Sequence, residues 1–364
     1  MNRLLPVLTS CLAFATSLCA QRMLTVGLAA QVREVDLATG AATPLGTMTG
    51  ILGATDDSVP AALAYDLVAG RLYAVSSIED RLYVVDPTDW RTRVVGDLQL
   101  GPNFIVSGLE HDLATGQLFG VGSDGGAGRL FTVDAATGAA TIVGPTGLTG
   151  VQSLAFDPAS GELFVIDTTA DRLYRVDRAT GATSGVGQLL AATFVDGMAH
   201  CLDDLTMYAV DRRPFDVYQL TSVDLTTGAA TAIGPTQPGN VTGMAYVLGT
   251  GRLLRTANGC GGVDVFVSGS PNLGGAVELR VQNATGAAFV GFGIDGATAP
   301  LCGCTVGHEW AVAVPGPIVE LPLPASSSIV GVSVFAQGLD LGGLGGCLNP
   351  TLSLTDTIEV RVGS

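Results

Sequence analysis

The sequence has 364 residues, of which 47% are apolar, and a formal net charge of −16 at pH 7. All 17 basic residues are arginines, and they form no basic stripe. This balance argues against nucleic acid and anionic membrane surfaces as partners, because like charges repel. The 50 glycines follow no collagen period, and with many Val, Leu and Thr they favour short strands joined by tight turns.

The first 20 residues predict a secretory signal peptide. Arg3 supplies a positive start, residues 4–18 are apolar and uncharged, and Ala20 is a small residue at the expected cleavage site. This segment is too short to span a bilayer comfortably, and no later segment is apolar enough, so we expect no transmembrane segment in the mature chain. The predicted location is secreted, cell-surface or periplasmic.

A fourteen-residue segment then recurs along the chain. It reads REVDLATGAATPLG, FTVDAATGAATIVG, YRVDRATGATSGVG and TSVDLTTGAATAIG, and a degenerate copy reads YVVDPTDWRTRVVG. A second motif alternates with it, as in LAYDLVAGRLYAV and LAFDPASGELFVI. Two interleaved motifs that share one period predict a single supersecondary unit copied five times.

Each unit contains four short β-like runs joined by loops that begin with Asp and end with Gly. The Asp carboxylate can accept a hydrogen bond from an amide two residues on, and the Gly can adopt positive φ, so these loops predict hairpins. Four antiparallel strands repeated at this spacing are typical of a β-propeller blade, with the fourteen-residue segment as its outer hairpin. We therefore expect an all-β fold with a five-bladed propeller over residues 21–258. Six blades is the alternative, if residues 47–60 hide a degenerate unit.

The ends of the repeat region predict ring closure. The mature chain starts inside a unit at MLTVGL, and the last unit leaves the pattern after its opening strand, residues 241–246. Joining these two pieces completes one blade and removes an exposed strand edge. GRLLRT, residues 251–256, competes with MLTVGL for the second strand of that blade.

The repeats G-x-L-[YF] and D-x-x-T-G-A-A-T resemble those of exported bacterial propellers related to the NHL type, whose function is uncharacterised. This resemblance covers residues 21 to about 256 and implies a fold without an activity. The segments PNLGGAVELRVQN and LTDTIEVRVG resemble a C-terminal domain appended to exported proteins of planctomycete-type bacteria. That resemblance implies an accessory or surface-retention module.

Residues 259–364 read as six or seven alternating strands cut by Gly and Pro turns, which predicts a β-sandwich domain. In an exported chain, cysteines clustered in a small domain favour disulfides, with the pairing open; the candidates are Cys260, Cys302, Cys304 and Cys347. The alternative is a zinc site at CGCTVGH, whose spacing matches no common pattern. Cys201 is interpreted as an odd, buried thiol.

A ligand site is expected on the propeller face whose loops differ between copies, because repetition marks scaffold and binding residues ride on variable loops. Glu110 replaces the Ala of the other units on the innermost strand, from which its side chain can reach the channel. The candidate ligand-binding residues are Glu110, Asn103, Asp196, Asn240, Asp167 and Asp211. Such oxygen donors suit calcium, a sugar or a cation, and the alternative is solvated loop acids. His111 and His200 occupy a slot that is aromatic in the other units and are interpreted as packing residues.

Three functions follow from these patterns. The leading hypothesis is a non-enzymatic binding or interaction module at the cell surface, with a protein or carbohydrate ligand and no cofactor. The second is a calcium-dependent lactonase-like hydrolase or lyase that uses Glu110, Asn103, Asp196 and Asn240 at the channel mouth. The third is a structural envelope protein. Neither G-x-S-x-G nor H-E-x-x-H occurs in the sequence.

Overall fold

The computed structural model describes residues 22–51, 61–66, 69–76, 78–101, 103–189, 194–202, 204–213, 217–236, 241–247, 251–296, 298–301, 304–342 and 351–363. These residues contain strands and two short 3₁₀ turns, η1 (Leu28–Ala30) and η2 (Ser327–Ile329), and no α-helix. The expectation of an all-β protein is therefore confirmed for the described part of the chain.

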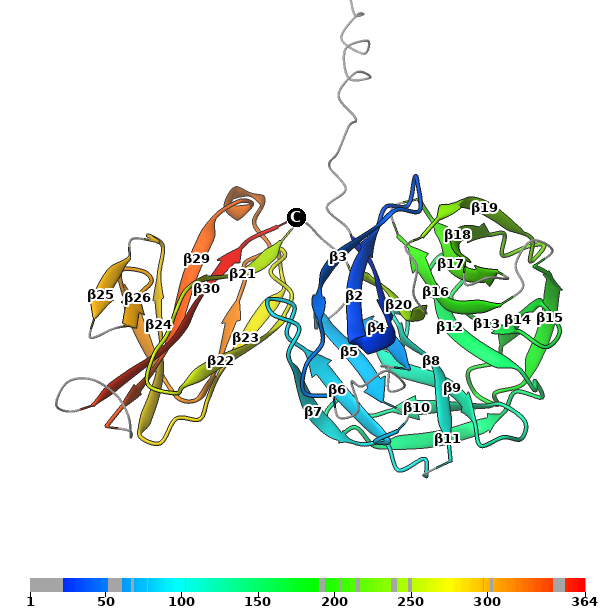
Figure 1. The fold of residues 1–364 in the computed structure, drawn as a ribbon, viewed down its shortest axis with the longest axis horizontal. Helices are drawn as coiled ribbons and strands as arrows, with labels where there is room; N and C mark the ends of the chain where they lie inside the picture. Colours follow the sequence, from blue (N-terminus) through cyan, green and yellow to red (C-terminus); the bar gives the residue numbers. More distant parts are fainter. Residues whose placement is uncertain are drawn as a thin grey trace, which may run out of the picture.

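The repeat region forms five antiparallel sheets of four strands each, drawn from blue to yellow-green in Figure 1. In spatial order the sheets are β20 (Val241–Val247), β1 (Arg22–Gly27), β2 (Gln31–Val35) and β3 (Ala42–Thr47); β4 (Ala62–Asp66), β5 (Arg71–Ser76), β6 (Arg81–Val85) and β7 (Thr92–Asp97); β8 (Ile105–Asp112), β9 (Gln117–Ser123), β10 (Arg129–Val133) and β11 (Ala140–Pro145); β12 (Val151–Asp157), β13 (Glu162–Asp167), β14 (Arg172–Val176) and β15 (Thr183–Gln188); and β16 (Val195–Cys201), β17 (Thr206–Arg213), β18 (Val217–Val223) and β19 (Ala230–Pro235).

The first and last repeat strands close the ring. Strand β1 pairs antiparallel with β20, and Met23 lies opposite Tyr246. The inner strands β4, β8, β12, β16 and β20 each contact the next, and β20 contacts β4. The predicted joining of the chain start to the last repeat strand is thus confirmed, and the protein is a β-propeller repeat protein. The alternative of a degenerate sixth unit in residues 47–60 stays a prediction, because residues 52–60 lie outside the described residues.

The Asp and Gly of each fourteen-residue copy make the predicted turn. Oδ1 of Asp36 accepts hydrogen bonds from the amides of Ala38 and Thr39, both at 2.9 Å. Gly40 follows at φ +80°, where a side chain would strain the backbone. The same arrangement recurs at Asp134, Asp177 and Asp224.

The last Gly of each copy is required by the neighbouring sheet. A Cβ on Gly187, in β15, would lie 1.7 Å from the carbonyl oxygen of Thr227, in the outer turn of the next sheet. Equivalent contacts join Gly96, Gly144 and Gly234 to the turns at Gly138, Gly181 and Gly40. The two glycines of the repeat therefore meet each other across every one of these boundaries.

The degenerate copy makes the fifth boundary differently. Trp90 takes the turn position that is Gly in the other four copies, at φ +64°. A Cβ on Gly46 would lie 2.2 Å from Cδ1 of its indole. A buried aromatic ring thus replaces a backbone contact, at the cost of a strained conformation.

Gly187→Ala tests the boundary contact. The added methyl would overlap the Thr227 carbonyl, so the two sheets must separate, and we expect the free energy of unfolding to fall by about 1–3 kcal/mol. Gly126→Ala is the matched control, because its new Cβ would lie 3.4 Å from the nearest heavy atom, Oδ1 of Asp124. Thermal and urea unfolding measure both, and equal stabilities of the two variants would contradict the contact.

The C-terminal part contains two larger sheets and a small hairpin, left in Figure 1. The five-stranded sheet has the order β21 (Arg252–Ala257), β30 (Leu352–Arg361), β29 (Ser333–Leu341), β24 (Ala287–Gly293) and β27 (Val312–Pro315); the three-stranded sheet has β22 (Asp264–Gly269), β23 (Ala276–Gln282) and β28 (Ile318–Pro322); and the hairpin has β25 (Ala299–Leu301) and β26 (Cys304–Val306). Buried residues of both larger sheets, such as Val267, Leu279 and Val360, share one hydrophobic core.

Strand β21 belongs to the C-terminal sheet and not to the repeat. In the sequence, GRLLRT competes with MLTVGL for one strand of the repeat, and the predicted repeat region extends to residue 258. Instead β21 pairs with β30, with Leu253 opposite Val360, and β1 takes the contested position. The resemblance to a repeat strand misleads here because Arg255 stands where the repeat has a small or apolar residue, and its guanidinium pairs with carboxylates of the degenerate turn and of the C-terminal part.

An arginine joins the two parts. The guanidinium of Arg255 lies 3.0 Å from carboxylate oxygens of both Asp86 and Asp89, in the degenerate turn. The fully buried Asp86 carboxylate also accepts the amide of Val267 at 2.8 Å. Phe266 enters the apolar cluster of the second and third repeat sheets. Charge-assisted bonds and apolar burial together fix the C-terminal part against the ring.

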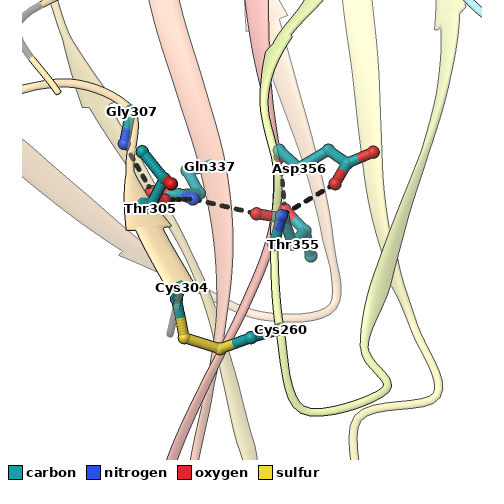
Figure 2. Close-up of a disulfide and its surroundings, with 8 residues drawn as sticks. Cys260, Cys304, Thr305, Gly307, Gln337, Thr355 and Asp356 are labelled. Atoms are coloured by element: carbon teal, nitrogen blue, oxygen red, sulfur yellow. Dashed lines mark hydrogen bonds between the residues drawn. A yellow bond between two sulfur atoms is a disulfide. The ribbon is translucent and has the colours of Figure 1, made fainter. Parts of the chain in front are cut away.

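The disulfide Cys260–Cys304 links the start of the C-terminal part to strand β26. Figure 2 shows the buried Gln337 beside it, with Nε2 donating to the carbonyl oxygens of Thr305 at 2.8 Å and Thr355 at 2.9 Å. Two of the four candidate cysteines are thus paired, while Cys302 and Cys347 lie outside the described residues. Cys201 is buried, as predicted.

Removal of this disulfide, by Cys260→Ser with Cys304→Ser, should destabilise the C-terminal part by about 2–4 kcal/mol. The bridge closes a loop over a sequence separation of 44, which restricts the unfolded chain. Calorimetry should show a lower Tm for the C-terminal transition, while the transition of the repeat region is unchanged. Retention of the C-terminal Tm in the double variant would show that the bridge contributes no stability.

Candidate functional site

Side chains from all five inner strands converge around a small cavity at one end of the central channel. The volume of this cavity is about 30 Å³. Its lining includes one residue from the equivalent position of each strand, namely Tyr65, His111, Phe156, His200 and Tyr246. A cavity of this size holds about one or two waters, far less than the roughly 300–1,000 Å³ of a typical ligand pocket.

Glu110 lines this cavity from β8, where the other four inner strands carry Ala. Its Oε1 accepts the amide hydrogen of His111 at 2.9 Å. Burial raises the pKa of Glu110 to about 8, because the carboxylate loses its hydration inside the ring. At neutral pH the side chain is therefore mostly protonated and can donate a hydrogen bond into the cavity.

The two histidines pair with aspartates of the preceding sheet. Nε2 of His111 lies 3.3 Å from Oδ1 of Asp66, and Nε2 of His200 lies 3.3 Å from Oδ1 of Asp157. Burial lowers the pKa of His200 although Asp157 opposes this shift. Both histidines are almost fully buried, which agrees with their interpretation as packing residues. Their aspartate partners were not predicted from the sequence, although an Asp follows the slot residue in three of the five copies.

Asp112 is the third aspartate that follows a slot residue. The slot residue of the next sheet is Phe156, which has no polar group to pair with it. The chain supplies Arg178 instead, whose guanidinium forms an ion pair with the fully buried Asp112 carboxylate. Arg178 comes from the outer turn of the next sheet, at a position that is Leu, Pro or Ala in the other copies. Arg178 thus supplies the positive partner for Asp112 that a histidine at the Phe156 position would otherwise supply.

Two of the predicted ligand-binding acids serve local turns. Oδ1 of the buried Asp167 accepts the amide of Thr169 at 2.8 Å, directly after β13. Oδ1 of Asp211 accepts a hydrogen bond from the amide of Phe194 at 3.2 Å, and Asp211 is also buried. These bonds use the carboxylate oxygens to hold loop backbone, so ligand binding by Asp167 and Asp211 stays a prediction.

The remaining candidates do not converge on Glu110. Asn103 is exposed and precedes β8, roughly 20 Å along an extended strand from Glu110. Asp196 lies at the start of β16, 3.6 Å from Nε of Arg212, and burial raises its pKa to about 6. Asn240 lies outside the described residues. Among the residues that the structure describes, no three His, Cys, Asp or Glu side chains come close enough together to hold a metal ion.

Comparison with known proteins agrees with a repeat architecture. Residues 111–288, just under half of the chain, match a family model described as a repeat of unknown function (DUF6923). No curated protein matches. Over the described residues, no helix has the length and apolar character needed to cross a membrane.

Several solved structures are similar in outline. A chain of the nidogen–laminin complex is 14% identical with a TM-score of 0.44, covering 63% of this chain and 98% of that one. The PQQ-bound aldose sugar dehydrogenase of Streptomyces coelicolor is 14% identical, with a TM-score of 0.39 and coverage of 83% and 94%. Virginiamycin B lyase of Staphylococcus aureus is 9% identical, with a TM-score of 0.36 and coverage of 57% and 63%. At these scores the likenesses indicate neither a ligand nor an activity.

Glu110→Gln should change how stability depends on pH. The folded state keeps the Glu110 proton up to a pKa of about 8, whereas the unfolded chain releases it near 4.5, so wild-type stability falls as pH rises through this range. The amide is neutral at every pH. We expect the free energy of unfolding of the variant to rise by about 1–3 kcal/mol relative to that of wild type when the pH is raised from 4.5 to 8.

Urea unfolding at both pH values measures this gain. The exposed Glu309→Gln is the control, and its stability should run parallel to wild type. Parallel curves for Glu110→Gln and wild type would show that the carboxyl group titrates normally in the folded protein.

Proposed function

We propose that the chain is an exported binding or interaction module at the cell surface, with a protein or carbohydrate ligand. In this proposal residues 1–20 are a signal peptide, the five repeat sheets are the blades of a five-bladed propeller that ends near residue 247, and the rest is a β-sandwich domain. The disulfide supports an oxidising compartment outside the cytosol.

The observation that carries the proposal is the exposure of large apolar side chains on the variable loops. Ile78 is 67% exposed in the loop between β5 and β6, Ile105 is 62% exposed at the start of β8, and Phe194 is 50% exposed before β16. By strand direction all three belong to the loop-bearing face opposite the repeated Asp…Gly turns. Apolar side chains on loops held by a rigid frame suit contact with a partner surface or a sugar ring.

The small size of the cavities between the inner strands also supports binding over turnover. A second small cavity on the axis, lined by residues such as Ser107, Ser153 and Met198, measures only about 10 Å³. Both cavities are far smaller than a typical ligand pocket. A ligand of ordinary size would have to bind outside them.

Binding to immobilised polysaccharides and to purified envelope proteins tests this function. The triple variant Ile78→Ser, Ile105→Ser and Phe194→Ser should lose at least about tenfold in affinity, because each change removes an apolar contact. The control is Leu113→Ser with Leu205→Ser, two exposed leucines in the turns of the opposite face. Equal loss in both sets, or in neither, would contradict a site on the variable face.

The calcium-dependent hydrolase makes a different prediction. It requires stoichiometric calcium in the purified protein, lost in Glu110→Gln, together with hydrolysis of lactones or esters. Because strand β8 separates Glu110 from the mouth that carries Asn103, we expect metal analysis of wild type and Glu110→Gln to give the same result. Calcium bound only to wild type would establish the hydrolase site and overturn the binding proposal.

A further inference from the structure

A mainly apolar cavity lies at the junction between the repeat sheets and the C-terminal part. Its volume is about 260 Å³, roughly nine times that of the channel cavity. Residues of β1, β3 and β5 form one side, and residues of β21 and the end of β22 form the other. The walls are mainly apolar and include Leu24, Leu45, Leu72, Val85, Trp90 and Leu253.

Arginine supplies the charge at this cavity. Arg22 lines it but is paired with Glu34 at 3.0 Å. Arg252 lines it too and is exposed, and among the described residues it forms no ion pair. The cavity therefore combines an apolar interior with one cationic group whose hydrogen-bond donors are available.

A second arginine stands beside the first. Arg361 lies directly opposite Arg252 in the pairing of β21 with β30, and it too forms no ion pair within the described part of the chain. Like charges directly opposite each other destabilise a sheet. In a chain with 33 acidic and 17 basic residues, partners for these arginines would have been easy to supply. Arg252 and Leu254 line both the cavity and the open depression that contains Arg361, so the two spaces adjoin.

The repeat departs from its own pattern at this place. Trp90 lines the cavity in the turn position that is Gly in the other four copies, and it holds φ +64°. Such a backbone strain persists only where the surroundings enforce it, and it is often found at functional sites. The indole supplies a large, flat apolar wall against which a ligand can pack.

We propose that the junction cavity binds a small amphipathic carboxylate. The apolar chain of the ligand lies among Leu45, Leu72 and Trp90, and its carboxylate is held by the guanidinium of Arg252 with support from Arg361. Arginine is suited to this role because its planar fork donates two parallel hydrogen bonds to a carboxylate. A bound carboxylate also relieves the repulsion between the two arginines. This site is separate from the loops of the variable face and does not depend on their function.

Titration of the full chain with octanoate tests the proposal. Calorimetry should give a Kd of about 0.1–1 mM, as expected for ten ligand heavy atoms. The chain has two tryptophans, and Trp310 packs beside the disulfide cluster away from the cavity. In a Trp310→Phe background, octanoate should therefore change the emission of Trp90. Octylamine, which has the same chain and the opposite charge, should bind at least about tenfold more weakly.

Two variants separate the head group from the chain. Arg252→Gln should weaken octanoate binding about tenfold or more, and Arg361→Gln should weaken it less, because Arg361 lines only the adjoining depression. Leu45→Phe should weaken binding by filling the cavity. Arg129→Gln is the control, because Arg129 lies in β10, which does not line the junction cavity, and pairs with Asp124.

The proposal is wrong if octanoate gives no heat and no change in Trp90 emission at about 5 mM, well above the expected Kd. It is equally wrong if octylamine binds as well as octanoate, or if Arg252→Gln and Arg361→Gln both bind like wild type. The triple variant of the exposed loop residues should bind octanoate normally, so failure here and failure of the surface-binding function are distinguishable.

Discussion

Close backbone contact between neighbouring sheets is the constraint on which the rest of the structure depends. Four of the five outer turns present a carbonyl group and a glycine to the last glycine of a neighbouring copy, at separations that leave no room for a Cβ. The link between Gly234 and Gly40 is of the same kind, so the contact that joins copies along the chain also closes the ring. Apolar clusters between the sheets then fill the space that these contacts define. This geometry explains the repetition of fourteen residues, because each segment contains both partners of the contact, the turn glycine and the last glycine.

The C-terminal part attaches at the one copy that breaks this rule. The turn at Asp86 keeps its local role, since Oδ1 accepts the amide of Thr88 at 2.8 Å. Its other oxygen faces Arg255 and the amide of Val267. Burial raises the pKa of Asp86, and the nearby Asp89 acts in the same direction, while Arg255 opposes both. A buried carboxylate in this position is tolerable only while the C-terminal part supplies its donors. The altered turn therefore provides the docking site for the C-terminal part, and the docked C-terminal part provides the hydrogen-bond donors that the turn requires.

The sequence was sufficient for the features that depend on local chemistry. Asp-to-amide turns and glycines at positive φ are readable from spacing, and they led to the four-stranded unit and to the pairing of β1 with β20. The competition between GRLLRT and MLTVGL could not be resolved from the sequence because both have the pattern of a repeat strand; the structure pairs β1 with β20 and β21 with β30. The pairs between His111 and Asp66, and between Arg178 and Asp112, join different sheets, so they follow from the register around the ring, which no single repeat encodes. The same holds for the junction cavity, whose walls come from three separate parts of the chain.

Tyr65 connects the two interior spaces of the molecule. Its side chain lines both the channel cavity and the junction cavity. Tyr65 is thus the one slot residue that also lines the junction with the C-terminal part. A ligand in the junction cavity would lie against the same aromatic ring that packs beside Glu110. The channel cavity and the junction cavity therefore share the side chain of Tyr65, which belongs both to the inner strands and to the surface against which the C-terminal part docks.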